Sequence, residues 1–367
     1  MNNLYIIYGR YYDFRNDSIT IGGVQTYISN LIEVASALFD RLVLLQMGEE
    51  EKDIRLEKVS IKQFSSASQS AFENNVYEWI KANDDILKCT VLFATDSIIF
   101  RKKLFPKSIA IQHGISWDIP KPDSKRGLRR TILSKALSAY RTIESLNKVK
   151  SVVCVDYNFQ NWYRSLTAKG SEKLIVIPNF TEIGPIFEKP VDKIKIIFAR
   201  RLFPYRGTRV FTEAIIKILE EYRSVEVTIA GDGPDEGYMH EHLDRFDSVT
   251  FTRYSSNESL SIHADKHIAV VPTVGSEGTS LSLLEAMSAQ CAVICTDVGG
   301  MTNVVLDRYN GLIVKAGDAI SLYEAIKKLI IDEELRKQIA ENAYRTVINS
   351  FSREIWKEKW NNVLEHY

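Results

Sequence analysis

The sequence has few of the features that would place a chain quickly. Only four of its 367 residues are cysteines, too few and too apolar in context for a disulfide framework. No apolar run reaches the ~18 residues that a membrane-spanning helix needs. Lysine plus arginine equals aspartate plus glutamate, at 47 each, so no overall field favours nucleic acid as a partner. The first residues lack the basic and apolar segments of a secretory signal, and we expect a cytoplasmic protein.

Three phosphate-binding motifs are also absent. No G-x-G-x-x-G follows the first apolar run, which argues against a dinucleotide-dependent oxidoreductase. No P-loop is present, and no Asp-x-Asp triplet occurs anywhere in the chain. The pair of carboxylates that commonly holds a divalent cation on a diphosphate is therefore missing. We expect no bound cofactor and no metal requirement.

What the chain does have is a regular alternation of short apolar runs with helix-length segments. One series is Leu4–Tyr8, Leu42–Gln46, Val91–Ala94, Ile109–Gln112 and Val152–Val155. A second is Ile194–Ala199, Val225–Ala230, His267–Val271, Ala292–Cys295 and Leu312–Val314. Continuous apolarity indicates strands buried on both faces, in parallel sheets covered by helices. The pattern predicts an α/β chain of two Rossmann-like, doubly wound domains.

The break between the two series lies near Pro178–Lys193. This stretch has three prolines and no helical period, which is typical of a linker. We predict a first domain over residues 1–180, a linker over 181–193 and a second domain over 194–350.

Polar residues follow several of the predicted strands, where the binding edge of such a sheet lies. His113 directly follows a strand, and Arg201 and Arg206 lie in the loop after another. The pair Gly22 and Gly23 opens an amphipathic helix after the first strand. His113 is either a structural histidine or a hydrogen-bond donor that lines a cleft. The two arginines form either a solvated basic turn or a phosphate site.

One short stretch in the second half predicts an anion site at the start of a helix. Its residues are Gly278, Thr279, Ser280 and Leu281. Thr279 or Ser280 is a suitable N-cap, and the free N–H groups of a first helical turn bind anions. Together with Arg201 and Arg206, this helix start favours a diphosphate site.

Glu285 lies on the apolar face of the same helix, next to Leu284. A carboxylate there costs roughly several kcal/mol unless a partner satisfies it. An ion pair with an arginine is one solution, and a sugar diol that donates to both oxygens is the other. Phosphate at the helix start and a diol one turn later describe the pyrophosphate and ribose of a nucleotide. Glu277 then faces the group beyond the β-phosphate, so the site suits a nucleotide-linked sugar.

A basic segment stands out in the first half, with nine lysines and arginines between Lys121 and Lys150. Interleaved leucine and isoleucine residues predict a basic amphipathic helix of the kind that lies on membrane surfaces. Its basic residues on the membrane or acceptor side are Arg126, Arg129, Arg130 and Lys135. The alternative is a solvated helix packed on its own sheet. Nucleic acid is disfavoured because Tyr140 is the only aromatic residue there that could stack on bases.

Taken together, these residues resemble the retaining glycosyltransferases of family four. The resemblance covers nearly the whole chain. Its most specific part is Glu277 and Glu285 with seven residues between them, followed by AMSAQCAVICTDVGG at 286–300 and NGLIV at 310–314. GGVQTY at 22–27, VIPNF at 176–180 and RRLFPYRG at 200–207 are also similar. It implies the GT-B fold, in which two Rossmann-like domains face a cleft.

The resemblance also implies roles for individual residues. Glu285 would hold the donor ribose and Glu277 would face the transferred sugar. Arg201 and Arg206 would bind the diphosphate, and His113 would lie beside the reacting sugar. The pair at 22–23 would approach the phosphate or the acceptor from the opposite domain. Residues 351–367 would form a helix that crosses back to the first, acceptor-binding domain.

Four departures from the family pattern bear on the donor sugar. Arg200 stands where glycine is usual, and Arg206 where lysine is usual. Thr279 and Ser280 replace a common Phe-Gly pair, and Asn303 stands where glutamate is common.

The implied reaction is metal-independent transfer of a hexosyl unit, with retention, from a nucleotide diphosphate sugar. We expect a UDP-sugar first and a GDP-sugar next. The acceptor would be a glycan or lipid-linked saccharide in bacterial surface polysaccharide synthesis, such as lipopolysaccharide or capsule, at the inner face of the cell membrane. A GT-B nucleotide-sugar epimerase and a non-catalytic nucleotide-sugar binding protein are the alternatives.

Overall fold

The structure is a computed structural model that describes residues 2–20, 22–118, 127–167, 170–275 and 277–367. Its contacts divide the chain into two compact units. The first unit consists of Met1–His113, Lys125–Pro178 and Trp356–Tyr367, and the second of Gly114–Ser124 and Asn179–Ile355. Neither unit is therefore one continuous piece of chain.

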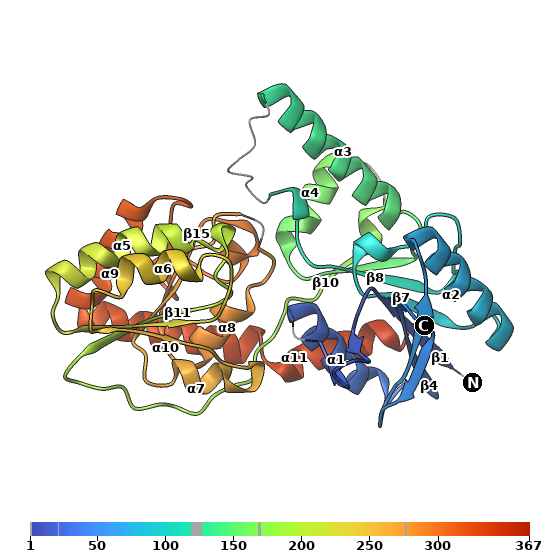
Figure 1. The fold of residues 1–367 in the computed structure, drawn as a ribbon, viewed down its shortest axis with the longest axis horizontal. Coiled ribbons are helices and arrows are strands. Elements are labelled where there is room, and N and C mark those ends of the chain that lie inside the picture. The colour runs from blue at the N-terminus through green and yellow to red at the C-terminus, as the bar shows by residue number, and fades with distance from the viewer. Residues whose placement is uncertain (1, 21, 119–126, 168–169, 276) are drawn as a thin grey trace. The chain divides into compact units, whose positions relative to one another are not determined.

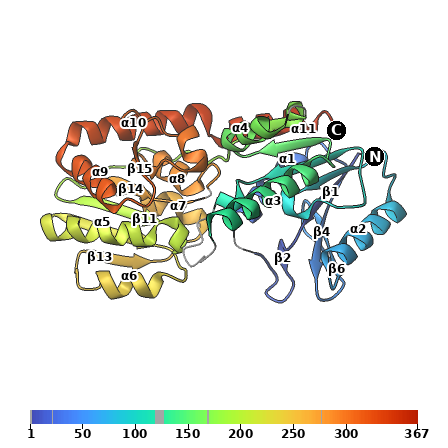
Figure 2. The same cartoon turned by 90° about the horizontal axis from the view of Figure 1, so that it is seen from above.

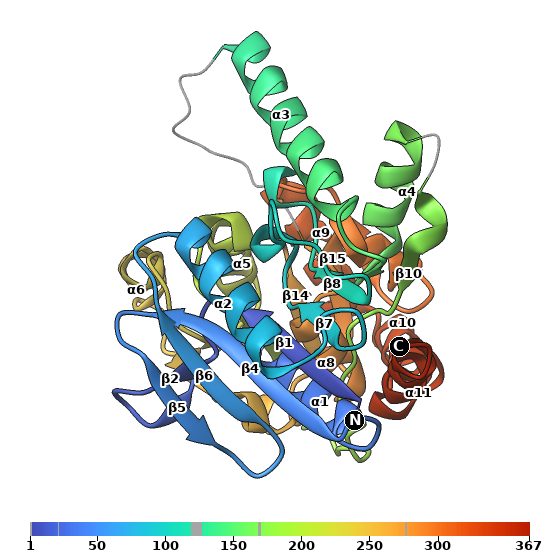
Figure 3. The same cartoon turned by 90° about the vertical axis from the view of Figure 1, so that its right-hand side faces the viewer.

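The first unit is built on an eight-stranded sheet with the order β10-β9-β8-β7-β1-β4-β6-β5. Figure 3 shows the strands from β7 through β1 and β4 to β6 side by side. The strands are β1 (Asn3–Tyr8), β4 (Arg41–Gly48), β5 (Lys52–Arg55), β6 (Ser60–Ser65), β7 (Thr90–Phe93), β8 (Ser108–Gln112), β9 (Ser151–Cys154) and β10 (Leu174–Val176). Neighbouring strands are parallel except β5 and β6, which are antiparallel. A small separate pair, β2 (Tyr12–Asp13) and β3 (Ser18–Ile19), follows β1.

The helices of the first unit begin where the sequence supplies caps or glycine. They are α1 (Gly23–Ala35), α2 (Gln69–Asn83), α3 (Leu128–Leu146), α4 (Tyr157–Leu166) and α11 (Arg353–Leu364), with short 3-10 turns η1 (Asp96–Ile98) and η3 (Ser171–Lys173). The Ser68 hydroxyl accepts the Ala71 N–H at the start of α2. The Asp156 carboxylate accepts the Phe159 N–H at the start of α4. Each side chain satisfies an amide that the helix itself leaves unpaired.

The second unit contains a six-stranded, all-parallel sheet with the order β13-β12-β11-β14-β15-β16. Its strands are β11 (Ile194–Ala199), β12 (Val225–Ala230), β13 (Val249–Thr252), β14 (Ile268–Val271), β15 (Ala292–Thr296) and β16 (Leu312–Val314). Its helices are α5 (Thr208–Glu221), α6 (Glu236–Leu243), α7 (Ser259–His263), α8 (Leu281–Ser288), α9 (Ala319–Ile331) and α10 (Glu333–Ser350). Its 3-10 turns are η2 (Ser116–Asp118), η4 (Pro204–Arg206), η5 (Ser256–Glu258) and η6 (Gly299–Asn303).

Two apolar cores lie on opposite faces of this second sheet. One is formed with side chains of α5, α6 and α9, and the other with side chains of α8 and α10. Figure 2 shows α5 and α6 on one side of the strands and α8 and α10 on the other. The sheet is therefore covered on both faces, as continuous apolar strands require.

The predicted α/β class with two Rossmann-like units is confirmed, and each of the ten expected strands is present. The strands that sequence reasoning missed include β5, β10 and β13, which lie at sheet edges. The burial of β5 alternates between half-buried and exposed residues, so it lacks a continuous apolar run. The antiparallel β5 also corrects the expectation of purely parallel sheets.

The segment 181–193, expected as a linker, lies within the second unit. Ile183 and Phe187 pack against its core. The Lys189 ammonium donates to the carbonyl oxygens of Ala264 and Ala289, at 2.8 Å each. These charge-assisted hydrogen bonds hold the segment against the second unit, although its backbone is irregular and rich in proline.

Helix α11 packs in the first unit from Trp356 onward. Trp356 and Trp360 are fully buried. The Trp360 indole Nε1 donates to the Tyr27 hydroxyl at 2.8 Å, and both indole rings meet the Tyr27 ring edge-on, at 5.2 and 6.1 Å between centroids. This aromatic cluster joins α11 to α1.

We predict that Tyr27→Phe lowers the free energy of unfolding of the first unit by about 1–3 kcal/mol, because a buried indole N–H loses its acceptor. Denaturant titration followed by tryptophan fluorescence measures the change. Tyr140→Phe is the control, since that side chain is 64% exposed and a surface change alters stability by no more than about 0.5 kcal/mol. Equal stability of the two variants would contradict the proposed role of the hydroxyl.

Candidate functional site

The strand order of the second sheet creates a topological switch point. The chain runs outward from β11 through β12 to β13 and then returns to the other side of β11 as β14. Arg200 directly follows β11, and Thr273 and Glu277 lie in the loop after β14. Ligands of such sheets bind outside the carboxyl ends of the strands at a switch point. The fold thus brings these three residues to the position where a ligand is expected.

A buried charged cluster forms there around one oxygen of Glu277. Its Oε2 accepts hydrogen bonds from Arg200 Nη2 at 2.8 Å, from Thr273 Oγ1 at 3.0 Å and from Arg206 Nη1. Arg200 Nη1 also donates to Thr273 Oγ1 at 2.7 Å. Within the part of the chain that the structure describes, no donor reaches the other oxygen, Oε1. Glu277 is therefore held on one side and keeps one oxygen to accept a further hydrogen bond.

The charge balance of this cluster keeps Glu277 ionised. The side chains of Arg200 and Glu277 are 5% and 10% exposed. Burial opposes the charge, but the adjacent Arg200 and Arg206 guanidinium groups hold the pKa of the Glu277 carboxyl below its usual value. Because two cations face one carboxylate, the cluster has a net positive charge, which favours an anionic ligand.

Two glycines fix the loops that carry this ion pair. Gly299 has φ 56°, and a Cβ there would lie 2.1 Å from the Glu277 carbonyl oxygen. Gly231 has φ 143°, and a Cβ there would lie 2.2 Å from the Arg200 carbonyl oxygen. The Gly300 N–H donates to the same Glu277 carbonyl at 2.8 Å. The glycines at 231 and 299 thus hold the backbone of the charged residues.

The two predicted phosphate-binding arginines lie in different environments. Arg206 ends the η4 turn, its side chain is 21% exposed, and its guanidinium lies 5.1 Å from the centre of the Tyr205 ring. Arg201 is exposed and lies over the Phe203 ring at 5.4 Å. Among the described residues, none forms an ion pair with Arg201. The structure therefore joins Arg206 to Glu277 and leaves Arg201 accessible.

Helix α8 begins after Ser280, as the sequence predicts. The Ser280 hydroxyl makes no capping hydrogen bond to the helix backbone, and lies 3.2 Å from the Ser282 hydroxyl instead. Thr279 is buried, and its carbonyl accepts from Asn179 Nδ2 at 2.6 Å. The start of α8 is thus held by neighbouring segments without a side-chain cap, which leaves its first amides for another acceptor.

Glu285 lies on α8 with a different kind of partner. It accepts a hydrogen bond from the hydroxyl of Ser259, at the start of α7. Tyr254 also lies near Glu285, and burial together with the Glu285 charge raises the pKa of the Tyr254 hydroxyl. Burial raises the pKa of the Glu285 carboxyl to about 7. In the described part of the chain no cation pairs with it. The arginine ion pair considered for Glu285 is therefore absent there and occurs at Glu277.

In the first unit, His113 follows β8 at the carboxyl edge of its sheet. Its Nε2 lies 2.9 Å from the carbonyl oxygen of Ala94, the residue after β7. Because a carbonyl only accepts, Nε2 carries the proton and Nδ1 is an acceptor. Burial lowers the pKa of His113 to about 4, so the ring is neutral near pH 7. The N–H expected for a ligand is used by Ala94, and the remaining nitrogen can only accept.

Sequence reasoning missed two carboxyl groups at this same edge. Asp96 follows β7 and Asp156 follows β9, and burial raises the pKa of each to about 6. Asp156 caps α4 through Oδ1, whereas no group among the described residues bonds its buried Oδ2. The available signal was their position directly after predicted strands.

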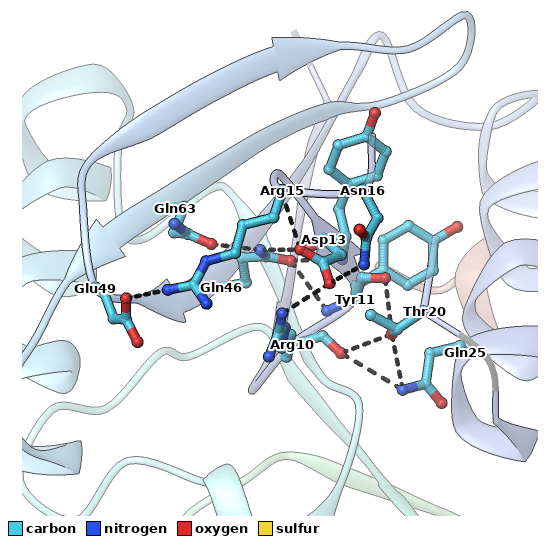
Figure 4. A network of polar contacts seen from close by, with 11 residues as sticks. Arg10, Tyr11, Asp13, Arg15, Asn16, Thr20, Gln25, Gln46, Glu49 and Gln63 are labelled. Carbon is cyan, nitrogen blue, oxygen red and sulfur yellow. Dashed lines mark hydrogen bonds and ion pairs between the residues drawn. The ribbon is translucent and has the colours of Figure 1, made fainter. Parts of the chain in front are cut away.

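Gly22 and Gly23 mark the start of α1, as predicted, with Gly22 at the N-cap and no side-chain cap. The segment before them, including β2 and β3, is held by the buried amide of Gln46 (Figure 4). Gln46 Oε1 accepts from the N–H groups of Tyr11 and Tyr12 at 3.0 and 2.8 Å, and its Nε2 donates to the Tyr12 carbonyl at 2.8 Å. This loop is therefore anchored to β4 by three hydrogen bonds.

The basic helix α3 has an exposed first half that extends from the rest of its unit (Figure 1). Arg129, Arg130 and Lys135 are exposed, and Arg126 lies outside the described residues. Four apolar side chains between them are also 48–77% exposed: Leu128, Ile132, Leu133 and Leu137. The alternative in which this helix packs its apolar side on its own sheet is therefore wrong for these residues.

Two further observations concern membranes and metals. None of the described helices combines the length and apolarity that crossing a bilayer requires. Among the described residues, no three histidine, cysteine, aspartate or glutamate side chains group closely enough to hold a metal ion.

Residues 179–346 match the family described as glycosyl transferases group 1. The matched segment lies within the second unit, and residues 179–346 are called the group 1 domain below. Glu277, Glu285 and the arginine loop all lie within this domain. An uncharacterised glycosyltransferase of Methanocaldococcus jannaschii is 25% identical over 336 residues, which cover 88% of each chain.

Another curated relative matches a shorter stretch of the chain. The capsular polysaccharide biosynthesis glycosyltransferase CapM of Staphylococcus aureus is 28% identical over 172 residues, 46% of this chain and 45% of CapM. The chain thus matches about half the length of this relative.

Solved structures show the same fold over the whole chain. Sucrose-phosphate synthase of Thermosynechococcus elongatus has a TM-score of 0.77 at 14% identity, covering 100% of this chain and 99% of that one. Anabaena HepE in complex with UDP has a TM-score of 0.72 at 15% identity and covers all of both chains. The fold is therefore GT-B, as the resemblance implied.

The opposite pKa shifts of the two glutamates predict opposite effects on stability. The pKa of Glu285 is raised from 4.5 to about 7 in the folded chain, so its stabilising contribution is complete below pH 4.5 and is lost as the pH rises through 7. Glu285→Gln should therefore raise the unfolding temperature of the group 1 domain at pH 8 and change it little near pH 4.5.

Glu277→Gln is the matched variant for this measurement. Since the folded pKa of Glu277 is lowered, its contribution is present above pH 4.5 and is lost on acidification. This variant should lower the unfolding temperature at pH 8. Destabilisation of the group 1 domain by Glu285→Gln at pH 8 would mean that a cation balances Glu285.

Proposed function

We propose that this chain is a retaining glycosyltransferase that moves a hexosyl unit from a nucleotide diphosphate sugar, with UDP favoured over GDP, to a glycan or lipid-linked acceptor. The observation that carries the proposal is the presence of two glutamates with different environments in one group 1 domain. Glu277 is held by guanidinium groups at the switch point, and Glu285, one turn into α8, has a raised pKa and no cation among the described residues. HepE, of similar fold, binds UDP, which supports the donor class.

The donor contacts follow from what each group still offers. Glu285 accepts two hydroxyls of the ribose, because a diol supplies the donors that a buried carboxylate needs. The backbone of Gly278, Thr279, Ser280 and Leu281 faces the diphosphate through the amides at the start of α8. Arg201 and Arg206 neutralise its charge. Glu277 accepts a hydroxyl of the transferred sugar through Oε1.

The proposed chemistry is attack on the same face as the departing phosphate, without a metal ion. The acceptor oxygen forms a bond to the anomeric carbon as the bond to the β-phosphate oxygen breaks. The acceptor proton passes to that phosphate oxygen, and Arg201 and Arg206 stabilise the charge on the leaving diphosphate. Neutral His113 supplies an acceptor nitrogen to a hydroxyl of the sugar, and the loop that leads to Gly22 and Gly23 contributes to the acceptor side.

Calorimetry with UDP, GDP, ADP and NAD in the presence of EDTA tests the donor site. One nucleoside diphosphate should bind, and Glu285→Ala should weaken it at least tenfold, which corresponds to about 1.4 kcal/mol. Glu354→Ala is the control, since this glutamate lies outside the 179–346 domain.

Two results would contradict the transferase assignment. Preference for NAD would indicate an oxidoreductase site. Release of free nucleotide from a nucleotide sugar, with no transfer to any saccharide acceptor, would favour the epimerase. If transfer does occur, NMR of the anomeric proton of the product shows whether the configuration is retained.

We further propose that the enzyme works in bacterial surface polysaccharide synthesis as a peripheral protein of the inner membrane face. The name of the relative CapM, which concerns capsular polysaccharide, supports the pathway. Helix α3 supports the location because exposed cations and exposed leucines on one helix suit an anionic bilayer surface.

Vesicle sedimentation tests the membrane proposal. Arg129→Glu/Arg130→Glu should reduce binding to vesicles that contain anionic lipid about thirtyfold, since the two lost cations contribute about 1 kcal/mol each. The control is Arg245→Glu/Lys337→Glu, which changes side chains that are 60% and 67% exposed. Equal binding of both double variants would rule out α3 as the contact.

A further inference from the structure

Arg200 occupies an unusual place in the Glu277 cluster. Its side chain is the most buried of the three charged side chains in the cluster. The exposed fractions are 5% for Arg200, 10% for Glu277 and 21% for Arg206. A guanidinium this buried needs partners for its donors, and its Nε has none among the described residues. Burying a guanidinium with an unpaired donor is energetically unfavourable, so Arg200 is expected to have a role that accounts for it.

Arg200 is held in the cluster by two hydrogen bonds, whereas Arg206 is joined to it by one ion pair. Arg200 bonds both Thr273 and Glu277, and its carbonyl oxygen packs against Gly231. Arg206 lies on a single 3-10 turn, and its ion pair in the described chain is with Glu277. Rotation of the Arg206 side chain breaks its ion pair with Glu277 and alters its contact with the Tyr205 ring on the same turn, while rotation of the Arg200 side chain breaks two hydrogen bonds.

The cluster holds one cation more than its carboxylate requires. With Arg206 as the only partner, its departure toward a phosphate would leave Glu277 buried without a counter-charge, which is strongly unfavourable. With Arg200 present, Glu277 keeps a cation whether Arg206 stays or leaves. Thr273 donates to the same Oε2, and this hydrogen bond does not involve Arg206.

We propose that Arg200 is a positioning residue, the permanent counter-ion of Glu277, and that it frees Arg206 to bind the donor diphosphate. This inference rests on the proposed function. Without a donor, Arg206 pairs with Glu277. When a nucleoside diphosphate binds, the Arg206 guanidinium exchanges Glu277 Oε2 for a phosphate oxygen. Arg200 and Thr273 keep the carboxylate in position, with Oε1 open to the sugar.

A double-mutant cycle tests whether Arg206 exchanges Glu277 for phosphate. Binding of UDP, or of GDP or ADP if the wild type prefers one of them, is measured by calorimetry in the presence of EDTA. Arg200→Met should weaken binding about tenfold, because Glu277 then retains Arg206. In Arg200→Met/Glu277→Gln this loss should disappear, so that the double variant binds within about threefold of Glu277→Gln alone. Arg200→Lys keeps the charge and should stay within about threefold of wild type.

The outcomes are distinct. The same tenfold loss from Arg200→Met in both the wild-type and the Glu277→Gln background would mean that Arg200 contacts the donor itself, which overturns the inference. Unchanged binding in Arg200→Met would also overturn it. Binding restored in the double variant shows that the domain folds, so misfolding cannot account for the loss. If wild type binds none of the three nucleoside diphosphates, the proposed function fails and the inference with it.

Discussion

The buried carboxylate of Glu277 is the constraint on which the second unit's binding edge depends. A charge that is 10% exposed at the end of a parallel sheet must be matched locally. Arg200 from the loop after β11 and Thr273 from the loop after β14 provide the match. Because these loops flank the switch point, one carboxylate joins the two halves of the sheet where they diverge. The same loops are then available to a ligand only in the geometry that this charge imposes.

The backbone around the cluster is arranged to permit that match. Gly299 and Gly231 touch the carbonyl groups of Glu277 and Arg200 at distances that exclude any side chain. Two glycine-containing turns that look ordinary in the sequence therefore position the backbone of the charged residues. Rigidity of this kind is what a binding site needs, since donors held in advance lose little entropy when a ligand arrives.

Much of the fold could be predicted from the sequence because its strands are continuously apolar. Ile194–Ala199 and Val225–Ala230 were predicted at their observed bounds. β13 was missed because an edge strand needs no second apolar face. In the site, residue types after strands pointed to Glu277 and Arg206. Their direct ion pair could not be predicted, because it depends on how two distant loops pack.

Other features of the site depend on single contacts that no pattern encodes. The Ala94 carbonyl determines which nitrogen of His113 carries its proton. The absence of a cation near Glu285, within the described chain, leaves its pKa near 7. Both follow from backbone positions set by tertiary packing, whereas residue spacing indicates only which groups lie at the same edge.

The hydrogen bond between Trp360 and Tyr27 joins residues 333 positions apart. During synthesis at about 5–20 residues per second, the interval between these two residues leaving the ribosome is tens of seconds. The buried side of α1 has to wait that long for α11, while all of 179–355 emerges in between. The Tyr27 surface of the nascent first unit therefore stays exposed to chaperones until Trp360 emerges, after residues 179–355 of the second unit.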